Sequence, residues 1–400
     1  KAGCLCQWPG GMDGKKKMKN IKRLLSTCLV GLVGIANAEF TPESIGTTLK
    51  LPGDYPDHWM LVHDVSFFHM LEGEMLVIDP LAENLQDQFK GMFPASFTAT
   101  FKASMDRGEF YVAESFFSRG GRGGERTDVV TIWDAQTLTV KEEIQIPPKR
   151  ISGMPKTLMS GFIEGEKFFG IYNFTPAQSV SIVNLKTREF VGEVPTPGCG
   201  FLLPNGQRSF SSICSNGTLR TSHLNDDGTL KRTTKTSVVF DPDKDPIFES
   251  PGLVGHAAYF TTFQGRILPI DTSSDELKVG KAWWLTDSTE RNWQPSGMMP
   301  ITVDSAGTGY LLMNPQGGEG THKDGGTEVW VYDLEMAKRT GRIKLKNRGI
   351  SLGTTGTGNT RLLIVTNTDM VLDVYQIPAG DFVQTLSTGA QTPFMVYGVN

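Results

Sequence analysis

The stretch that decides the fold is Glu125-Arg-Thr-Asp-Val-Val-Thr-Ile-Trp-Asp-Ala-Gln-Thr-Leu-Thr-Val-Lys-Glu-Glu-Ile-Gln-Ile-Pro147. Apolar residues lead to Trp133-Asp134, a polar Ala-Gln-Thr turn follows, and a second apolar series leads to Ile146. Asp134 is placed where a carboxylate accepts hydrogen bonds from the backbone N–H groups of a turn. The stretch therefore predicts a β-hairpin.

One pattern recurs along the chain: an apolar strand is followed by an acidic or amide residue and then by a turn. It is found at residues 75–79, 129–134, 180–184, 221–225, 267–271, 329–333 and, more weakly, 371–375. These intervals, roughly 40 to 60 residues, are typical of the four-stranded blades of a β-propeller. The 45 glycines and 22 prolines argue against a helical protein. The sequence predicts an all-β fold, a seven-bladed β-propeller with an N-terminal arm; a pair of β-sandwiches and an eight-bladed ring are the alternatives.

The first part of the chain has the layout of a secretory signal peptide. A basic segment at residues 18–23 precedes an apolar run at residues 24–35, and small residues end at Ala38 before Glu39. A membrane anchor is the alternative, but a run of about 12 apolar residues is shorter than the roughly 20 that a spanning helix needs. We expect residues 1–17 to be an upstream extension, 18–38 the signal peptide cut near Ala38-Glu39, 39–65 the arm and 66–400 the propeller.

Charge and cysteine content agree with an exported chain. Residues 39–400 carry 42 acidic and 32 basic side chains, a formal charge of −10, which argues against nucleic-acid binding. No later stretch is long and apolar enough to insert into a membrane. Cys199 and Cys214 are the two cysteines after the leader, on either side of a predicted hairpin. We expect them to form a disulfide, with two buried free thiols as the alternative.

Three further features offer candidate sites, and each has a plainer structural explanation. His58, His63 and His69 lie near Asp57 and Asp64, but their spacing puts successive rings on different faces of any regular element. The Arg119–Gly124 stretch lacks the Lys-Ser/Thr ending of a phosphate-binding loop, so an inter-strand loop is the better interpretation. The pair Trp283-Trp284 is more typical of core or interface anchors than of a stacking platform. No metal site and no catalytic residue are therefore expected on this chain.

Several short sequence segments resemble the same protein family. They are residues 122–134 continuing to 146–150, Gly198-Cys199 with Ile213-Cys214, 245–248, 292–295, and 319–323 before 328–333. Together they resemble the heavy (large) subunit of the quinoprotein amine dehydrogenases, that is, the heavy chains of aromatic amine dehydrogenase and methylamine dehydrogenase. The resemblance runs in order through most of residues 60–395.

The resemblance implies a periplasmic propeller that pairs with a small, disulfide-rich light subunit in a two-plus-two heterotetramer. In that family the cofactor, tryptophan tryptophylquinone, and the catalytic base belong to the light subunit. The complex oxidises a primary amine substrate to an aldehyde and ammonia, and a blue-copper protein or a cytochrome accepts the electrons. The heavy subunit binds no cofactor itself and forms the wall of the substrate channel.

One residue role follows from the same resemblance. Phe97, in Pro94-Ala-Ser-Phe-Thr-Ala-Thr100, matches the phenylalanine that in the family reaches toward the quinone and shapes the substrate pocket. The structural alternative for Phe97 is an ordinary core aromatic. For the whole chain, the alternative function is a non-catalytic secreted propeller that binds or scaffolds without a light chain; a propeller hydrolase or lyase would need an acid-base set that the sequence does not indicate.

Overall fold

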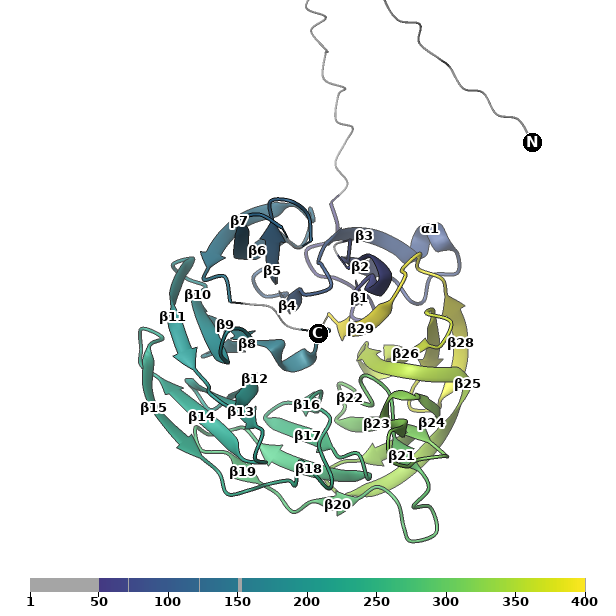
Figure 1. Ribbon diagram of the computed structural model, residues 1–400. Helices are drawn as coiled ribbons and strands as arrows, with labels where there is room; N and C mark the ends of the chain where they lie inside the picture. Colours follow the sequence, from purple (N-terminus) through teal and green to yellow (C-terminus); the bar gives the residue numbers. More distant parts are fainter. Residues whose placement is uncertain (1–49, 71, 122, 150–152, 400) are drawn as a thin grey trace, which may run out of the picture. The chain divides into compact units, whose positions relative to one another are not determined.

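The computed structural model describes residues 50–70, 72–121, 123–149 and 153–399. The predicted upstream extension, the signal peptide with its cut at Ala38-Glu39, and residues 39–49 of the predicted arm lie outside the described residues. The described part of the unit formed by residues 48–400 is an all-β propeller, in which antiparallel sheets are arranged around a central axis (Figure 1).

Five sheets contain four or five strands each. The closing sheet has the order β29 (Pro393–Gly398), β1 (Met60–Asp64), β2 (Glu74–Ile78), β3 (Phe89–Pro94). The second sheet is β4 (Thr100–Ser104), β5 (Glu109–Phe117), β6 (Arg126–Asp134), β7 (Val140–Ile146), and the third is β8 (Ser160–Ile163), β9 (Phe168–Asn173), β10 (Ser179–Asn184), β11 (Glu189–Pro195). The fourth is β12 (Cys199–Asn205), β13 (Ser209–Cys214), β14 (Leu219–Leu224), β15 (Leu230–Lys235). The fifth is β16 (Gly252–Val254), β17 (Ala257–Thr261), β18 (Arg266–Asp271), β19 (Lys278–Val279), with β20 (Trp283–Trp284) also on β18.

The remaining sheet has eight strands because one strand serves two sets of partners. It contains β21 (Gln294–Pro295), β22 (Ile301–Val303), β23 (Thr308–Asn314), β24 (Gly326–Asp333), β25 (Lys338–Thr355), β26 (Leu362–Asn367), β27 (Leu372–Gln376) and β28 (Asp381–Leu386). The first half of β25 pairs with β24, from Lys338 to Lys344, and its second half pairs with β26, from Gly349 to Thr355. The chain therefore passes from an outer position to an inner position without leaving the extended conformation.

Strands from the two ends of the described chain close the ring. β29 pairs with β1, and Leu61 lies opposite Tyr397 in this register. The sequence analysis placed residues 60–64 in the arm, whereas the structure places them in β1, between β29 and β2. Local sequence could not show this, because the strand beside β1 comes from more than 300 residues away.

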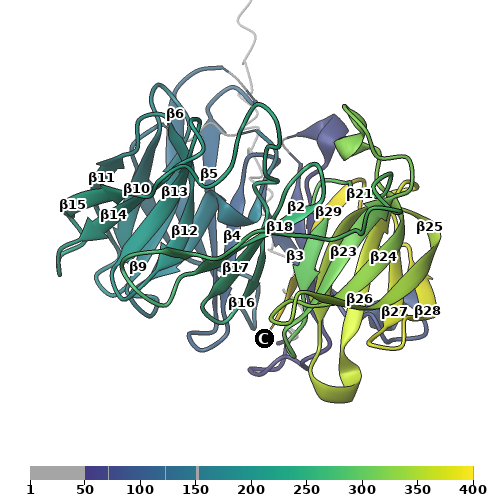
Figure 2. The same cartoon turned by 90° about the horizontal axis from the view of Figure 1, so that it is seen from below.

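The core is divided into clusters that each lie between two neighbouring sheets. Phe93 and Leu61 of the closing sheet pack with Phe110 and Trp133 of the second sheet. Comparable clusters join the second to the third, the third to the fourth, the fourth to the fifth, the fifth to the eight-stranded sheet, and the eight-stranded sheet to the closing sheet. Seen from the side, the sheets stand next to one another around the axis (Figure 2).

Burial along each sheet explains the sequence pattern. The middle strands are buried on both faces, so β9 and β26 read as continuous apolar runs. The outer strands are exposed, and β15 is mostly polar. The predicted hairpin is confirmed as β6 and β7, and Asp134 Oδ1 accepts hydrogen bonds from the N–H groups of Gln136 (3.0 Å) and Thr137 (2.9 Å).

Helical structure in the described residues is limited to short turns. They are α1 (Leu85–Gln88) and the 3₁₀ turns η1 (Phe67–His69), η2 (Thr157–Met159), η3 (Thr321–Lys323) and η4 (Gly358–Thr360). No helix among these residues has the length and apolar content to cross a membrane.

Candidate functional site

One side of the ring carries Phe97, the glycine-rich loop and the two cysteines. Strands alternate in direction, so the β1–β2 connection (residues 65–73) and the β3–β4 connection (95–99) leave from the same side. Every later sheet begins on that side, which therefore also carries the glycine-rich loop 118–125, the start of β12 at Cys199 and the end of β13 at Cys214. We call this side the Phe97 face.

Phe97 lies in the short β3–β4 connection, whose backbone makes several hydrogen bonds. Its N–H donates to the carbonyl of Met70 at 3.0 Å, and the N–H of Ala95 donates to the carbonyl of Gly73 at 2.9 Å. The N–H of Ala99 closes the turn on the carbonyl of Ser96 at 2.8 Å. The backbone of Gly73 passes so close that a Cβ there would be 2.4 Å from the carbonyl oxygen of Ala95. The position of Phe97 is therefore fixed by the β1–β2 connection.

Two buried polar side chains form hydrogen bonds with the backbone of this connection. His63 Nε2–H donates to the carbonyl of Ala95 at 3.0 Å, and the Glu114 carboxylate accepts from the N–H of Ser96 at 3.2 Å. Both side chains are almost fully buried. Burial lowers the pKa of His63 to about 4, so the ring is neutral at pH 7 and keeps its proton on Nε2. The loop of Phe97 thus has support from β1 and β5.

The surface next to Phe97 is aromatic. The Phe97 ring is 8% exposed and packs edge-on against Phe67, with ring centroids 5.8 Å apart. Phe67 packs in the same way against Phe68, and Phe68 is 79% exposed. Met70, Phe116 of the second sheet and Phe174 of the third sheet also lie exposed on this side. We call Phe67, Phe68, Met70, Phe116 and Phe174 the aromatic surface.

The cysteines join the first two strands of the fourth sheet. Cys199 of β12 lies opposite Cys214 of β13, and the two sulfur atoms form a disulfide. The predicted pairing is confirmed. It ties together the ends of this hairpin on the Phe97 face.

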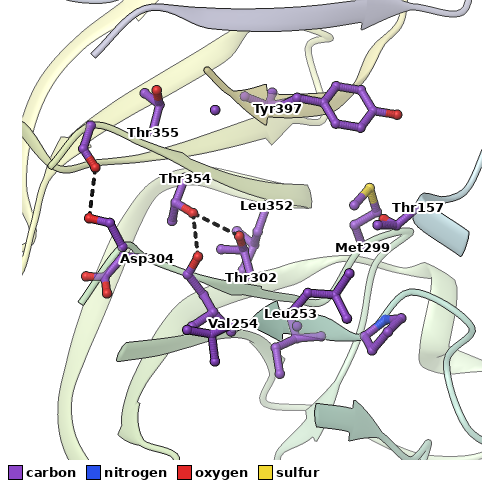
Figure 3. A pocket seen from close by; sticks show the side chains of 18 of the residues that line it. Thr157, Leu253, Val254, Met299, Thr302, Asp304, Leu352, Thr354, Thr355 and Tyr397 are labelled. Carbon is purple, nitrogen blue, oxygen red and sulfur yellow. Dashed lines mark hydrogen bonds between the residues drawn. The ribbon is translucent and has the colours of Figure 1, made fainter. Parts of the chain in front are cut away.

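A cavity of about 450 Å³ lies among the inner strands. β16, β22, the second half of β25 and β29 supply most of its wall, and Thr157 of η2 lies at one end (Figure 3). Asp304 at the other end is engaged, since its carboxylate accepts from Arg361 at 2.7 Å and from the Tyr310 hydroxyl at 3.1 Å. Phe97 is not part of this cavity wall.

The three clustered histidines occupy separate environments. His58 Nε2 is 3.2 Å from Asp79, His63 is buried under the Phe97 loop, and His69 Nδ1 is 2.8 Å from the Gln391 amide oxygen. Within the described ranges, no group of three or more His, Cys, Asp or Glu side chains is arranged to hold a metal ion.

Comparison with known proteins identifies the family. The family model for the methylamine dehydrogenase heavy chain matches residues 58–399. This chain belongs to the methylamine dehydrogenase heavy-chain family. It is 26% identical over 343 residues to the methylamine dehydrogenase heavy chain of Methylobacillus flagellatus, covering 85% of this chain and 84% of the relative. The corresponding protein of Methylorubrum extorquens is 24% identical over 344 residues, covering 83% of this chain and 79% of the relative.

A solved structure supports the propeller fold. The periplasmic gluconolactonase of Pseudomonas aeruginosa superimposes with a TM-score of 0.56 at 12% sequence identity, over 86% of this chain and 99% of that one. At this identity the similarity concerns the fold alone, and the heavy-chain family is established by the sequence match over residues 58–399.

In this heavy-chain family member, sequence reasoning missed the residues that surround Phe97. His63 was considered only as a metal ligand, and Glu114 and the aromatic surface were not singled out. The adjacent pair Phe67-Phe68, shortly after a buried strand, was the available signal.

The tryptophan pair lies elsewhere in the fold. Trp283 packs against Tyr332 with ring centroids 5.6 Å apart, and the ring of Trp284 lies 3.7 Å from the Arg291 guanidinium. Both indoles therefore have structural partners, as the sequence analysis favoured.

Proposed function

We propose that this chain is the heavy subunit of a periplasmic amine dehydrogenase whose tryptophan tryptophylquinone belongs to a small light subunit. The observation that carries the proposal is the heavy-chain family match over residues 58–399. The assembled enzyme would convert a primary amine to an aldehyde and ammonia, with electrons leaving to a blue-copper protein or a cytochrome. The cofactor supplies the electrophile and electron sink, and this chain supplies orientation and exclusion of water.

The aromatic surface is the proposed light-subunit interface. Phe67, Phe68 and Met70 project from the closing sheet, Phe116 from the second sheet and Phe174 from the third. Exposed aromatic and methionine side chains are enriched at protein interfaces, where their burial stabilises the complex. Trp283 and Trp284 lie in the fifth sheet, away from this surface in sheet order, and are engaged by Tyr332 and Arg291.

We assign Phe97 to the edge of the substrate pocket. The ring is held at the base of the aromatic surface by the Met70 carbonyl and by contact with Phe67. A light subunit seated on that surface would bring its cofactor to the Phe97 loop. The loop would then limit the size of the amine that fits, because its five residues are tied to β1, β5 and the β1–β2 connection.

We propose seven blades, obtained by dividing the eight-stranded sheet in the middle of β25. A core cluster lies between the two halves, with Leu312 and Val329 on one side and Leu363 and Tyr375 on the other. This cluster resembles the clusters between the other sheets, which supports treating each half as one blade. The seven occurrences of the strand-acid-turn pattern in the sequence agree with this number.

The decisive experiment is purification of the native complex. The chain is expressed together with the small cysteine-rich protein from the neighbouring reading frame, exported, and purified through a tag on the heavy chain. We expect a two-plus-two complex with visible-region absorption that bleaches on addition of a primary amine. F68D and F116D should each weaken light-subunit binding by tenfold or more, while M336D, at an exposed position in the β24–β25 turn on the opposite side, should not.

A chain that purifies alone, with no small partner in the genome neighbourhood, would favour the non-catalytic scaffold. A complex whose absorption does not respond to any primary amine would contradict the assigned reaction while leaving the partnership intact. These two outcomes separate the partner from the chemistry.

A further inference from the structure

Lys102 is an interior lysine on the inner strand of the second sheet. Its Nζ donates a hydrogen bond to the carbonyl oxygen of Thr157 at 3.2 Å. Part of the side chain is accessible to solvent, yet burial lowers the pKa of Lys102 to about 8. A side chain that is deep in the protein and still accessible faces an interior space. Lys102 is not among the residues that line the cavity, but its Nζ lies beside Thr157, which does line it. We infer from this that Lys102 borders the space inside the ring at the Thr157 end of the cavity.

The charge of Lys102 has no counter-charge among the described residues. No carboxylate in these ranges lies within ion-pair distance of its Nζ, and the Thr157 carbonyl is a neutral acceptor. The neighbouring lysine differs, because Lys156 Nζ is 2.5 Å from the Glu249 carboxylate. A buried ammonium group with only one neutral acceptor gains from an added anion.

Two hydroxyl groups face the same region. Thr157 lines the cavity, and its buried Oγ1 has no hydrogen-bond partner within the described residues. Tyr397 also lines the cavity, and its hydroxyl donates to the Met395 sulfur at 3.4 Å, which is a weak acceptor. Burial raises the pKa of Tyr397, so its hydroxyl keeps its proton. Figure 3 shows the hydroxyl end of Tyr397 directed toward the end of the cavity where Thr157 and Met299 lie.

The three donors come from consecutive inner elements around the axis. The ring of Tyr397 in β29 packs against Phe101 in β4, next to Lys102, with centroids 5.2 Å apart. Thr100 of β4 is hydrogen-bonded to Ser160 of β8 at 2.8 Å, directly after η2 with Thr157. The arrangement therefore follows from ring closure and from the succession of the closing, second and third sheets.

We propose that this cavity binds a small organic carboxylate. The carboxylate oxygens accept hydrogen bonds from Lys102 Nζ, Thr157 Oγ1 and the Tyr397 hydroxyl. The apolar part of the ligand rests on Leu253, Met299 and Leu352, which line the same cavity. Its volume of about 450 Å³ is within the usual range for small-molecule sites. The site is separate from Phe97 and does not depend on the proposed amine dehydrogenase function.

The test uses the full exported chain and two probes of the same shape. Benzoate and its neutral analogue benzamide are titrated at constant ionic strength and pH 7 by isothermal calorimetry, with thermal shift as a second measurement. We expect saturable benzoate binding in the millimolar range or tighter, with benzamide at least tenfold weaker. K102M should weaken benzoate binding at least tenfold, and T157V and Y397F two- to tenfold each. K156M is the matched control and should stay within twofold of the wild type.

Two results would overturn the proposal. One is the lack of saturable benzoate binding, and the other is benzoate affinity that K102M leaves unchanged. Should K102M fail to fold, as judged by circular dichroism, T157V and Y397F decide the question, because an unchanged affinity in both also removes the proposed site.

Discussion

At the scale of single residues, Phe97 tests the assignment of the substrate pocket. F97A removes a ring that is 8% exposed and that contacts Phe67 at the base of the aromatic surface. In the assembled enzyme we expect the ratio of kcat/KM for aromatic amines to that for methylamine to change about tenfold, the usual effect of altering an apolar pocket. F89A, an exposed site at the far end of β3, is the control. An unaltered ratio together with a lowered Tm would assign Phe97 to the core.

His63 makes stability depend on pH. Its pKa is about 6.5 in the unfolded chain and about 4 in the folded protein, so the unfolded state binds the proton more tightly. The stability from keeping this ring neutral is fully present above pH 6.5 and is lost as pH falls toward 4, by on the order of 3 kcal/mol. H63Q, which retains a donor for the Ala95 carbonyl, should flatten this part of the curve in urea unfolding between pH 7 and 4.5. The exposed H256Q should keep the wild-type slope; equal slopes for both variants would be evidence against the buried neutral ring.

At the scale of elements, the β1–β2 connection positions the Phe97 loop. G73A would place a Cβ 2.4 Å from the Ala95 carbonyl oxygen and 2.9 Å from that of Asp64, so the backbone has to move. Overpacking of this kind costs about 1–3 kcal/mol, and the same shift should change amine preference in the direction of F97A. G192A on β11, where a Cβ meets nothing within 4 Å, is the matched control. Calorimetric Tm and the amine ratio check both effects, and a variant with wild-type values in both would show that the loop does not depend on Gly73.

At the scale of the whole molecule, β29 holds the ring closed. A chain that ends at Thr392 lacks β29, the inner one of the two partners of β1, and it also loses Met395 and Val396 from the core. We expect the single cooperative unfolding transition to be lost, with a larger hydrodynamic radius in gel filtration, because the closing sheet then has an unpaired inner edge. Removal of Asn400 alone should leave the transition unchanged. A cooperative transition that survives the larger deletion would mean that pairing with β29 is not what closes the fold.

Hairpins and repeats could be predicted from the sequence because they depend on neighbours in the chain. Asp134 accepts from Gln136 and Thr137, two and three residues away, and Cys199 pairs with Cys214 across a single turn. The residues of the candidate site could be predicted less well from the sequence. Phe97 was found through the family resemblance, whereas its supports His63 and Glu114 are a histidine and an acid whose burial no local pattern indicates.

The sequence alone determined a repeating all-β chain, its disulfide and its membership of a recognisable family, since strand periodicity, turn acids and motif order are properties of short segments. Only the tertiary structure decided that residues 60–64 belong to the closing sheet, that Thr157 and Tyr397 line one cavity, and that Lys102 donates to the carbonyl of Thr157. The physical reason is ring closure. Pairing β29 with β1 brings together residues from opposite ends of the chain, and a local pattern of hydrophobic residues carries no information about such distant partners.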